Sequence, residues 1–491
     1  MVACESLNMS SALPVIPLFA FASVKYRRLL QVAAAMAAGL PLYWVLGPQP
    51  VAWLCWCAPL PVLWLVLRSS RRDATWIGAL AALLGLSSNL TYLRLLMPLP
   101  AVLAVLVAKT LLWVLVLLLT RRAVLRYQHG WTVLAYPLLS VALDTLMARL
   151  LPDGNWGSLA YSQADFLPML QVAALAGVPA LLFLLCLVPS ALALLLMPGR
   201  RHLQPALWTA MLVLLAWAGG AARLHAAVPA APGPLVGLAV IDDFLAPRMP
   251  PARAEAVWNR YVQQVELLAG QGATVVLLPE KIATLTPAAA APLQQRFSAL
   301  ARRLGIWITV GIALHDGDGK RNLAWLFSPD GASPDGYQKH HLAPPERDFL
   351  AGGSYQVQPV AGQRMGLAIC KDMHFAALGH AYGAAGASAM LVPAWDFGLD
   401  AWLGARMTLV RGVENGYAVV RASREGLLTV SDAYGRVVAE GASSSLPGAT
   451  LLAALPGPAA AAPWARWLGP LFGWLCVAAS ALLLAMLCRR R

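Results

Sequence analysis

The sequence predicts two structural parts, a helical bundle that crosses a membrane several times and an α/β domain outside the membrane. Three observations predict this fold. Long apolar runs fill the first 228 residues, basic residues cluster at alternate ends of these runs, and short β-type runs alternate with helical patterns between residues 229 and 465. The 491-residue chain is 59% hydrophobic and 12% charged, whereas soluble domains carry roughly a quarter charged residues. An ordinary soluble protein is therefore excluded.

The formal charge of +14 is unevenly distributed along the chain. Residues 229–465 contain 18 basic and 18 acidic residues, so the whole excess of positive charge lies outside this segment. A nucleic-acid-binding protein is expected to carry its basic surface on a folded polar domain. We therefore expect no nucleic-acid partner.

Several apolar runs reach the roughly 20 residues that a helix needs to cross a hydrocarbon core. We predict seven spans before the polar segment and one after it, at residues 28–47, 50–67, 74–97, 100–120, 130–150, 167–197, 205–227 and 466–488. The apolar segment near the start is short and lacks the basic start and cleavage site of a signal peptide, which favours an interfacial lead-in. The predicted organisation is a lead-in (1–27), a seven-span region (28–228), an outer domain (229–465) and a final span with a basic tail (466–491).

Basic residues indicate which way the spans run. Of the 19 basic residues outside the polar segment, 14 lie in five clusters, at residues 25–28, 68–72, 121–126, 200–201 and 489–491. Loops on the opposite side of the predicted spans contain none. Because positive charge near span ends marks the cytoplasmic side, we predict cytoplasmic termini and a domain on the outer side.

Two ionisable residues, Lys109 and Asp144, fall inside predicted spans. Charge is costly there and usually faces a partner or a wet cavity. The sequence is equally compatible with a structural pair and with a functional role.

Residues 229–465 have the length of one domain with its own core. Segments 253–271 and 289–304 have apolar residues at helical spacing. Short apolar runs typical of strands occupy residues 235–241, 275–278, 306–312, 323–327, 365–369, 389–392, 417–422 and 427–430. This alternation predicts an α/β fold with helices covering buried sheets.

Of seven cysteines, only Cys370 lies in the predicted outer domain. A lone thiol outside the cytoplasm is either a buried inert residue or a retained nucleophile. Cys370 and Glu280 each end an apolar strand, and Lys339 follows the turn at 333–336. Each residue alone has an ordinary structural interpretation. Together, a thiol, a carboxylate and an ammonium at strand ends are expected to meet at one rim.

These three residues resemble the carbon-nitrogen hydrolase (nitrilase) superfamily, whose Glu-Lys-Cys triad occurs in this order on an α-β-β-α sandwich. With the membrane spans, the chain from residue 28 onward resembles the bacterial apolipoprotein N-acyltransferases. Further similar positions are Gly154-Asn155-Trp156, Tyr161-Ser162-Gln163, Lys339 to Pro344 with Glu346, and Arg406, Arg411, Glu414, Arg421 and Ser423. The resemblance implies a multi-span α-helical membrane bundle carrying a nitrilase-like α-β-β-α domain.

The chain departs from the family in three places. Lys371-Asp372 follow the cysteine where the family usually has Tyr-Glu. Only residues 393–397 represent the family's Ser-Asn-Asp-x-Trp-Phe run, and Pro344-Pro345 replace a glycine before the acid. Because these changes surround the nucleophile, they bear on substrate identity more than on reaction class.

The resemblance implies that Cys370 is the nucleophile, Glu280 the general base and Lys339 the cation that holds the oxyanion and lowers the thiol pKa. The backbone N–H of Lys371 would be a second oxyanion donor, and Glu346 would orient Lys339. Trp395 and Phe397 are expected at the acyl entrance and Trp156 in the adjoining loop. Trp402 is either there or in the core.

The implied reaction moves an acyl chain from a membrane phospholipid to Cys370, and then to the N-terminal amine of a diacylglyceryl apolipoprotein. The implied location is the bacterial inner membrane, with the catalytic domain periplasmic and the chain a monomer. No cofactor is implied. We expect no metal, because the histidines of the domain lack ligand spacing beside an acid.

Two alternatives stay open from the sequence alone. The first is a membrane-tethered amidase that uses water in place of the amine, which the Lys371-Asp372 departure suggests. The second is a transport or scaffold protein without catalysis, which the prolines within the predicted spans keep open.

Overall fold

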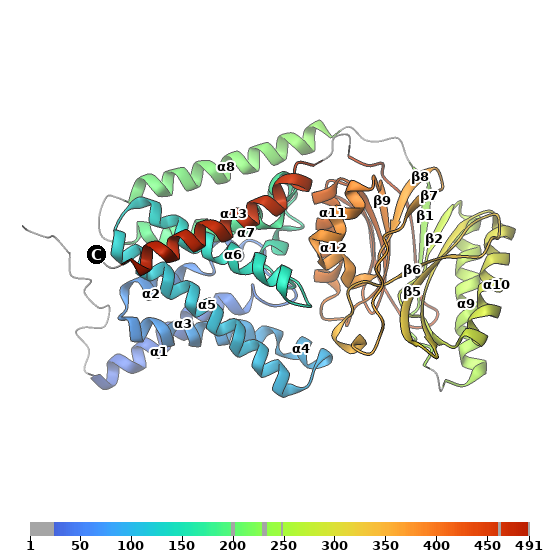
Figure 1. The fold of residues 1–491 in the computed structure, drawn as a ribbon, viewed down its shortest axis with the longest axis horizontal. Coiled ribbons are helices and arrows are strands. Elements are labelled where there is room, and N and C mark those ends of the chain that lie inside the picture. Colours follow the sequence, from blue (N-terminus) through green and yellow to red (C-terminus); the bar gives the residue numbers. More distant parts are fainter. Residues whose placement is uncertain (1–23, 198–201, 228–232, 247–248, 460–462, 490–491) are drawn as a thin grey trace, which may run out of the picture.

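The computed structural model describes residues 24–197, 202–227, 233–246, 249–459 and 463–489. Most of the predicted lead-in lies outside the described residues, as do Arg200, Arg201, Arg490 and Arg491 of the basic clusters. Figure 1 shows a helical bundle and a sheet-containing domain side by side, with the C-terminus at the end of the bundle far from the sheets.

The bundle contains nine α-helices among the described residues. They are α1 (Val24–Tyr43), α2 (Leu60–Arg68), α3 (Arg71–Leu86), α4 (Leu90–Leu96), α5 (Leu99–Tyr127), α6 (Ala135–Leu150), α7 (Leu167–Leu195), α8 (Leu203–Ala226) and α13 (Ala465–Cys488). Six helical segments of the described chain are long and apolar enough to cross a membrane: 71–96, 99–127, 130–150, 167–195, 203–226 and 465–488. They match six of the eight predicted spans.

The first two predicted spans differ from these six. The run at 28–47 is mostly helix α1, whose basic start lowers its mean hydropathy. The run at 50–67 forms a 3-10 turn and the nine-residue helix α2 instead of one long helix. The reason is proline, which lacks an N–H and ends helices: Pro50 and Pro59 both precede α2.

The short second segment nevertheless runs the length of the bundle. Near the sheet domain, Trp56 Nε1 donates to Gln163 Oε1 (3.0 Å), and Gln163 Nε2 donates to Ala52 O (2.9 Å). At the opposite end, Arg121 Nη2 donates to Ser69 O (2.6 Å). The direction of each helix therefore still alternates along the chain, as the eight-span prediction requires.

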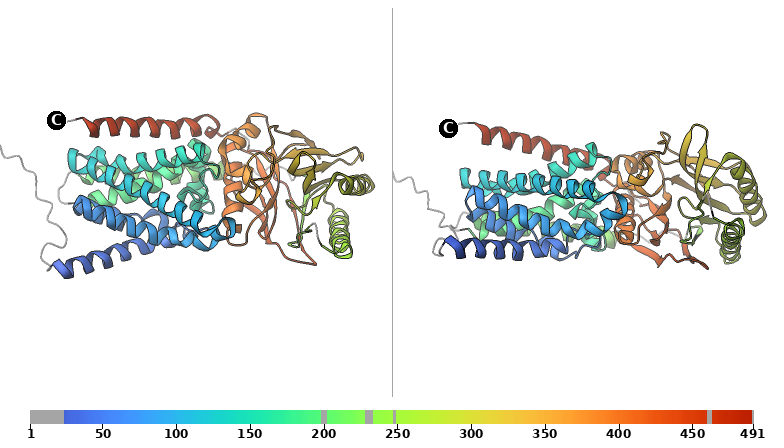
Figure 2. Two further views of the ribbon diagram at one scale, coloured as in Figure 1. Left: turned by 60° about the horizontal axis from the view of Figure 1, so that its bottom comes forward. Right: turned by 90° about the horizontal axis from the view of Figure 1, so that it is seen from below.

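The basic clusters of the described residues gather at the end of the bundle far from the sheets (Figure 2). Arg122 Nη2 and Arg126 Nη1 donate to Leu487 O at 2.6 and 2.8 Å. These guanidinium groups satisfy carbonyls that the last turn of α13 leaves without partners. The cluster at residues 121–126 therefore also stabilises the end of α13.

The second part contains two β-sheets. The strands are β1 (Leu235–Val240), β2 (Val275–Leu277), β3 (Thr284–Leu285), β4 (Trp307–Asp316), β5 (Gly319–Phe327), β6 (Asp335–Gln338), β7 (Val357–Val360), β8 (Gln363–Leu367), β9 (Ala389–Trp395), β10 (Ala418–Arg424), β11 (Leu427–Ser431), β12 (Val437–Ala442) and β13 (Ala449–Ala454). One sheet has the order β13-β1-β2-β4-β5-β6, with β3 beside β4, and the other β12-β11-β10-β9-β8-β7.

The sheets and four helices form four layers, α-β-β-α (Figure 1). Apolar side chains on the facing sides of the two sheets make one core, including Leu238, Leu277, Leu367, Leu391 and Val420. Helices α9 (Pro251–Gly270) and α10 (Pro287–Leu304) cover the first sheet on its outer side. Helices α11 (Ala376–Ala384) and α12 (Ala401–Asn415) cover the second sheet and face the bundle. The predicted fold class is confirmed.

Buried polar contacts fix α12 on the bundle. Helix α7 is interrupted at Ala176 and Gly177, where Gly177 has φ +74°. Glu414 Oε1 accepts from the backbone N–H of Val178 (2.8 Å), a donor that the interruption leaves without its helical partner. Arg411 Nη2 donates to Tyr161 O–H at 2.6 Å. The outer domain is thus held at a defined position over the membrane helices.

Candidate active site

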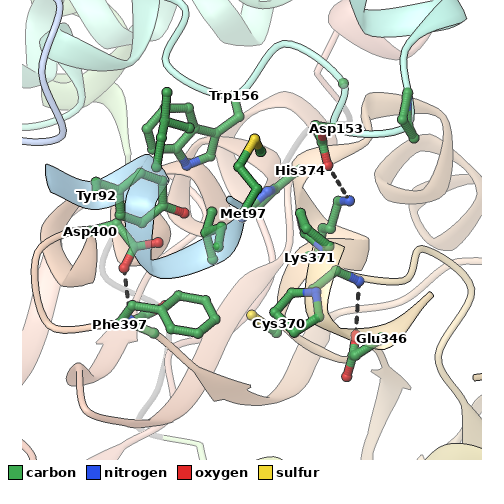
Figure 3. Close-up of a pocket in the computed structure, with 18 of the residues that line it drawn as sticks. Tyr92, Met97, Asp153, Trp156, Glu346, Cys370, Lys371, His374, Phe397 and Asp400 are labelled. Carbon is green, nitrogen blue, oxygen red and sulfur yellow. Dashed lines mark hydrogen bonds and ion pairs between the residues drawn. The ribbon is translucent and has the colours of Figure 1, made fainter. Parts of the chain in front are cut away.

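A cavity of about 290 Å³ lies where the outer domain meets helices α4 and α5 and the loop after α6. Its wall includes all eight residues singled out from the sequence: Glu280, Lys339, Cys370, Glu346, Lys371, Trp395, Phe397 and Trp156. Figure 3 shows the Cys370 sulfur facing the cavity, with Tyr92 and Trp156 of the bundle on its far side. Strand ends from both sheets and the membrane part therefore share one space.

Lys339 is the centre of a buried ion-pair network. Its Nζ lies 2.8 Å from Glu280 Oε1 and 2.8 Å from Glu346 Oε2. The expected contact between Glu346 and Lys339 is therefore present. Asn322, on β5, donates from Nδ2 to Glu280 Oε1 (2.6 Å) and to Glu346 Oε1 (2.7 Å). In the sequence, Asn322 is recognisable only as an amide residue at the start of an apolar strand, with no indication that it belongs to the site.

The network keeps Lys339 and Glu346 charged. Burial by itself would lower the pKa of Lys339, but the Glu280 and Glu346 carboxylates raise it well above its ordinary value. Burial would raise the pKa of Glu346, but the ammonium groups of Lys339 and Lys281 hold it below its ordinary value. Near neutral pH, a carboxylate and an ammonium therefore stand side by side next to the thiol.

Cys370 lies three residues after the end of β8, at the start of a 3-10 turn over residues 370–374. Its φ is +43°, a left-handed conformation that costs a non-glycine residue about 1–3 kcal/mol. The sharp turn aims the sulfur into the cavity, where Sγ lies 3.5 Å from Trp395 O. Lys281, next to Glu280, also has a positive φ of +47°. Backbone strain therefore occurs beside both the thiol and the carboxylate.

The thiol pKa differs from the expectation. Burial raises the pKa of the Cys370 thiol to about 12, the charge of Glu280 adds to this, and Lys339 opposes it. Lys339 therefore acts in the predicted direction, but desolvation of the thiolate outweighs it. The predicted effect of Lys339 is present, but the net pKa of the thiol is raised, so the thiol needs a base to remove its proton.

The two residues after the cysteine have different contacts. Asp372 is fully buried, and its carboxylate accepts from Ile369 N–H (3.0 Å), His341 N–H (2.8 Å) and Tyr337 O–H (2.8 Å). It thereby ties the turn that carries Cys370 to the loop that follows Lys339. This positioning role was not visible in the sequence, where Asp372 only marked a departure from the family.

Lys371 points toward the membrane part. Its Nζ lies 2.6 Å from Asp153 Oδ1, in the loop after α6, and donates to Leu342 O at 2.7 Å (Figure 3). Lys371 is nearly buried, whereas half of the Asp153 side chain is exposed. This one ammonium therefore joins three segments that border the cavity: the turn that carries Cys370, the loop after α6 and the loop that follows Lys339.

Aromatic rings continue from the outer domain into the bundle. Arg424 Cζ lies 3.5 Å from the Trp395 ring centroid, a cation-π contact that holds the ring. Trp395 and Phe397 have centroids 6.0 Å apart, and those of Tyr92 and Trp156 are stacked at 4.6 Å. Trp402 does not line this cavity, because its Nε1 donates to Asp165 Oδ2 (2.9 Å) at the junction with the bundle.

His374 and Asp400 are among the further ionisable groups of the outer domain that line the cavity. Burial, with the nearby Lys371 and Arg421 cations, lowers the pKa of His374 well below its ordinary value, so this imidazole is neutral. Burial and the Asp396 charge raise the pKa of Asp400 to about 6. In the described part of the chain, no group of three His, Cys, Asp or Glu side chains is arranged to hold a metal ion.

Two family models match this chain. The apolipoprotein N-acyltransferase N-terminal domain matches residues 38–191, and carbon-nitrogen hydrolase matches residues 245–450. The chain belongs to the apolipoprotein N-acyltransferase family. Among its relatives is an apolipoprotein N-acyltransferase of Geobacter metallireducens, 27% identical over 91% of this chain and 92% of the relative. One from Gloeobacter violaceus is 29% identical over 84% and 85%.

Solved structures similar to this N-acyltransferase belong to the nitrilase superfamily. An amidase from Nesterenkonia sp. is 21% identical, with a TM-score of 0.39, over 47% of this chain and 93% of the amidase. A branch 10 member of the nitrilase superfamily from Saccharomyces cerevisiae is 21% identical, with a TM-score of 0.40, over 46% of this chain and 91% of that one. The carbon-nitrogen hydrolase model, the named relatives and the six membrane-length helices of the described chain identify this N-acyltransferase as a multi-pass membrane enzyme with a nitrilase-like domain.

Proposed function

We propose that this N-acyltransferase moves an acyl chain from a membrane phospholipid, through a thioester on Cys370, to the N-terminal amine of a diacylglyceryl apolipoprotein. The observation that carries the proposal is the shared cavity. Cys370, Glu280 and Lys339 line one side of it, and membrane helices line the other. Both proposed substrates are anchored in lipid, and extracting a chain costs about 0.8 kcal/mol per methylene, so the site has to adjoin the membrane.

In the first half-reaction, Glu280 takes the Cys370 thiol proton while the sulfur attacks the ester carbonyl carbon of the phospholipid. The raised thiol pKa makes this proton transfer necessary. Lys339 Nζ and the backbone N–H of Lys371 stabilise the oxyanion. The carbon–oxygen bond then breaks, and Glu280 returns the proton to the departing lysophospholipid oxygen.

In the second half-reaction, the neutral amine of the apolipoprotein attacks the thioester carbon. Glu280 accepts the proton of the amine nitrogen and delivers it to the sulfur as the carbon–sulfur bond breaks. Glu346, hydrogen-bonded to Lys339, keeps the ammonium directed at the site between the steps. The products are an amide and the regenerated thiol, which predicts ping-pong kinetics.

The proposed location is the bacterial inner membrane, with both termini cytoplasmic and the catalytic domain periplasmic. The gathering of basic clusters at the end of the bundle far from the sheets supports this orientation, since such clusters remain on the cytoplasmic side. We expect the enzyme to act as a monomer, which light scattering in detergent would test.

The proposal is tested by incubating the purified full chain with a phospholipid labelled in its acyl chain. We expect a hydroxylamine-sensitive label on the protein that Cys370→Ala abolishes, and transfer of the label to a diacylglyceryl-cysteine peptide. A protein that remains unlabelled would contradict the acyltransferase reaction. Hydrolysis of small amides would then favour the amidase. Full cellular function of the Cys370→Ala variant would instead favour a protein without catalysis.

A further inference from the structure

A second cavity lies within the bundle, directly behind the first. Its volume is about 190 Å³, and all its lining residues come from the membrane part, among them Leu42, Leu86 and Leu182. Lys109, Met147 and Trp156 line both cavities. These three residues, named here the septum, therefore form the wall between the catalytic cavity and the inner cavity.

The septum carries an ammonium group inside the membrane. Lys109 Nζ lies 5.9 Å from the Trp156 ring centroid, in a cation-π contact. Among the described residues, no carboxylate lies within the 4.0 Å of an ion pair with it. Asp144 and Asp153 act on it only from farther away. A charge at this depth without a direct partner is costly and is retained where it has a function.

On the inner side, the septum is backed by further polar groups. Asp144 lines the inner cavity, and its Oδ2 accepts from Asn155 Nδ2 at 3.0 Å. Trp156 Nε1 is buried and has no hydrogen-bond partner. A methylene chain that passed the septum would displace water from the Lys109 ammonium and from this cluster without replacing its hydrogen bonds.

The geometry of the catalytic cavity places an acyl chain against this wall. Its outer-domain side carries charges, whereas its bundle side carries Leu93, Val105 and Met147. An acyl chain on Cys370 that packs along these apolar residues has its methyl end at the septum, because Met147 belongs to both.

We propose that the septum of Lys109, Met147 and Trp156 ends the acyl-chain site and so sets the length of chain that the enzyme accepts from its donor. This inference rests on the proposed function, because it assumes an acyl chain on Cys370. Removing the barrier joins the two cavities and gives a longer chain room beside the leucines of the inner cavity. In the unmodified protein, each methylene that leaves lipid without an apolar site to enter disfavours the longer chain by about fourfold, and removing the barrier removes this penalty.

The test uses the full chain in detergent with an equimolar mixture of saturated phosphatidylglycerols of fourteen to twenty carbons. Intact-protein mass spectrometry reads the length of the chain on Cys370 directly, without an acceptor. In the variant Lys109→Ala/Asp144→Asn, which removes the ammonium and its distant counter-charge together, we expect the adducts to shift toward longer chains by about fourfold per methylene.

A second variant, Met147→Ala, widens the septum without changing charge, and we expect a smaller shift in the same direction. Leu103→Ala is the matched control, because Leu103 lies on the same helix but is half exposed on the lipid side. Variants that form the adduct with the unmodified chain distribution would overturn the inference. If the unmodified protein forms no Cys370 adduct at all, the proposed function fails and this inference with it.

Discussion

The two walls of the catalytic cavity differ in how their charges are compensated. On the outer-domain wall, the Lys339 ammonium contacts two carboxylates directly, and Asn322 bridges the same two groups. On the bundle wall, the one contact of the Lys109 ammonium within the described part of the chain is with the face of the Trp156 ring. The first arrangement fixes reacting groups before substrate arrives, which is what electrostatic stabilisation requires. The second leaves a charged group at the far end of an apolar surface, where we infer that it limits the length of the acyl chain.

The largest effect on activity is expected from substitution of the nucleophile on the outer-domain wall. Cys370→Ala should lower acyl transfer by about 10⁴-fold or more, since loss of a nucleophile in a catalytic triad has effects of that size. Cys186→Ala, which alters a thiol buried in the bundle, should leave the covalent label in place. Labelling that persists without Cys370 would place the chemistry elsewhere.

The next effect concerns the buried network. Lys339→Met leaves the Glu280 and Glu346 carboxylates without their shared ammonium, and breaking such a buried pair costs about 3–5 kcal/mol of unfolding free energy. We expect a matching fall in the thermal unfolding midpoint and loss of acyl transfer. Lys320→Met is the control, because the Lys320 pair with Asp348 is exposed, and such pairs contribute about 1 kcal/mol or less. Equal losses in the two variants would contradict the difference in compensation.

A smaller effect on the stability of the fold is expected when the pH is lowered. Glu346 has a lowered pKa in the folded protein, so its contribution to stability is present above its unfolded pKa of 4.5 and is lost as the pH falls below that value. The thermal unfolding midpoint of the unmodified enzyme should therefore fall between pH 5 and pH 3. Glu346→Gln should be less stable at pH 6 and show a smaller fall. Parallel curves for the two proteins would argue against the lowered pKa.

The smallest effect is expected where the two walls meet. Asp153→Asn removes the charge that faces Lys371, and because Asp153 is half exposed we expect a cost of about 0.2–1 kcal/mol. A double-mutant cycle with Lys371→Met measures the coupling, with both unfolding and the rate of Cys370 labelling as readouts. Coupling in the labelling rate without coupling in stability would show that the bridge positions the loop for the reaction. No coupling in either would mean that the contact is not maintained.

Much of this enzyme was predictable because the relevant signals are local. Apolar length and basic clusters predicted eight spans, six of which are long apolar helices in the described chain, and two strand ends and a turn indicated Glu280, Cys370 and Lys339. The short second segment was less accessible, since whether prolines shorten a helix without preventing the chain from crossing depends on its neighbours. Gln163 and Arg121 show this, because they contact its two ends from distant parts of the chain.

Only the tertiary structure decided how the predicted groups are compensated. Asn322 and Glu280 are 42 positions apart and Lys371 and Asp153 are 218 apart, so no local pattern links them. The thiol pKa is the clearest case. The sequence indicated a cation near Cys370, but packing around the sulfur determines the desolvation that raises its pKa to about 12. Length and periodicity determine elements and strand ends, whereas hydration and counter-charges at a site depend on which surfaces the fold brings together.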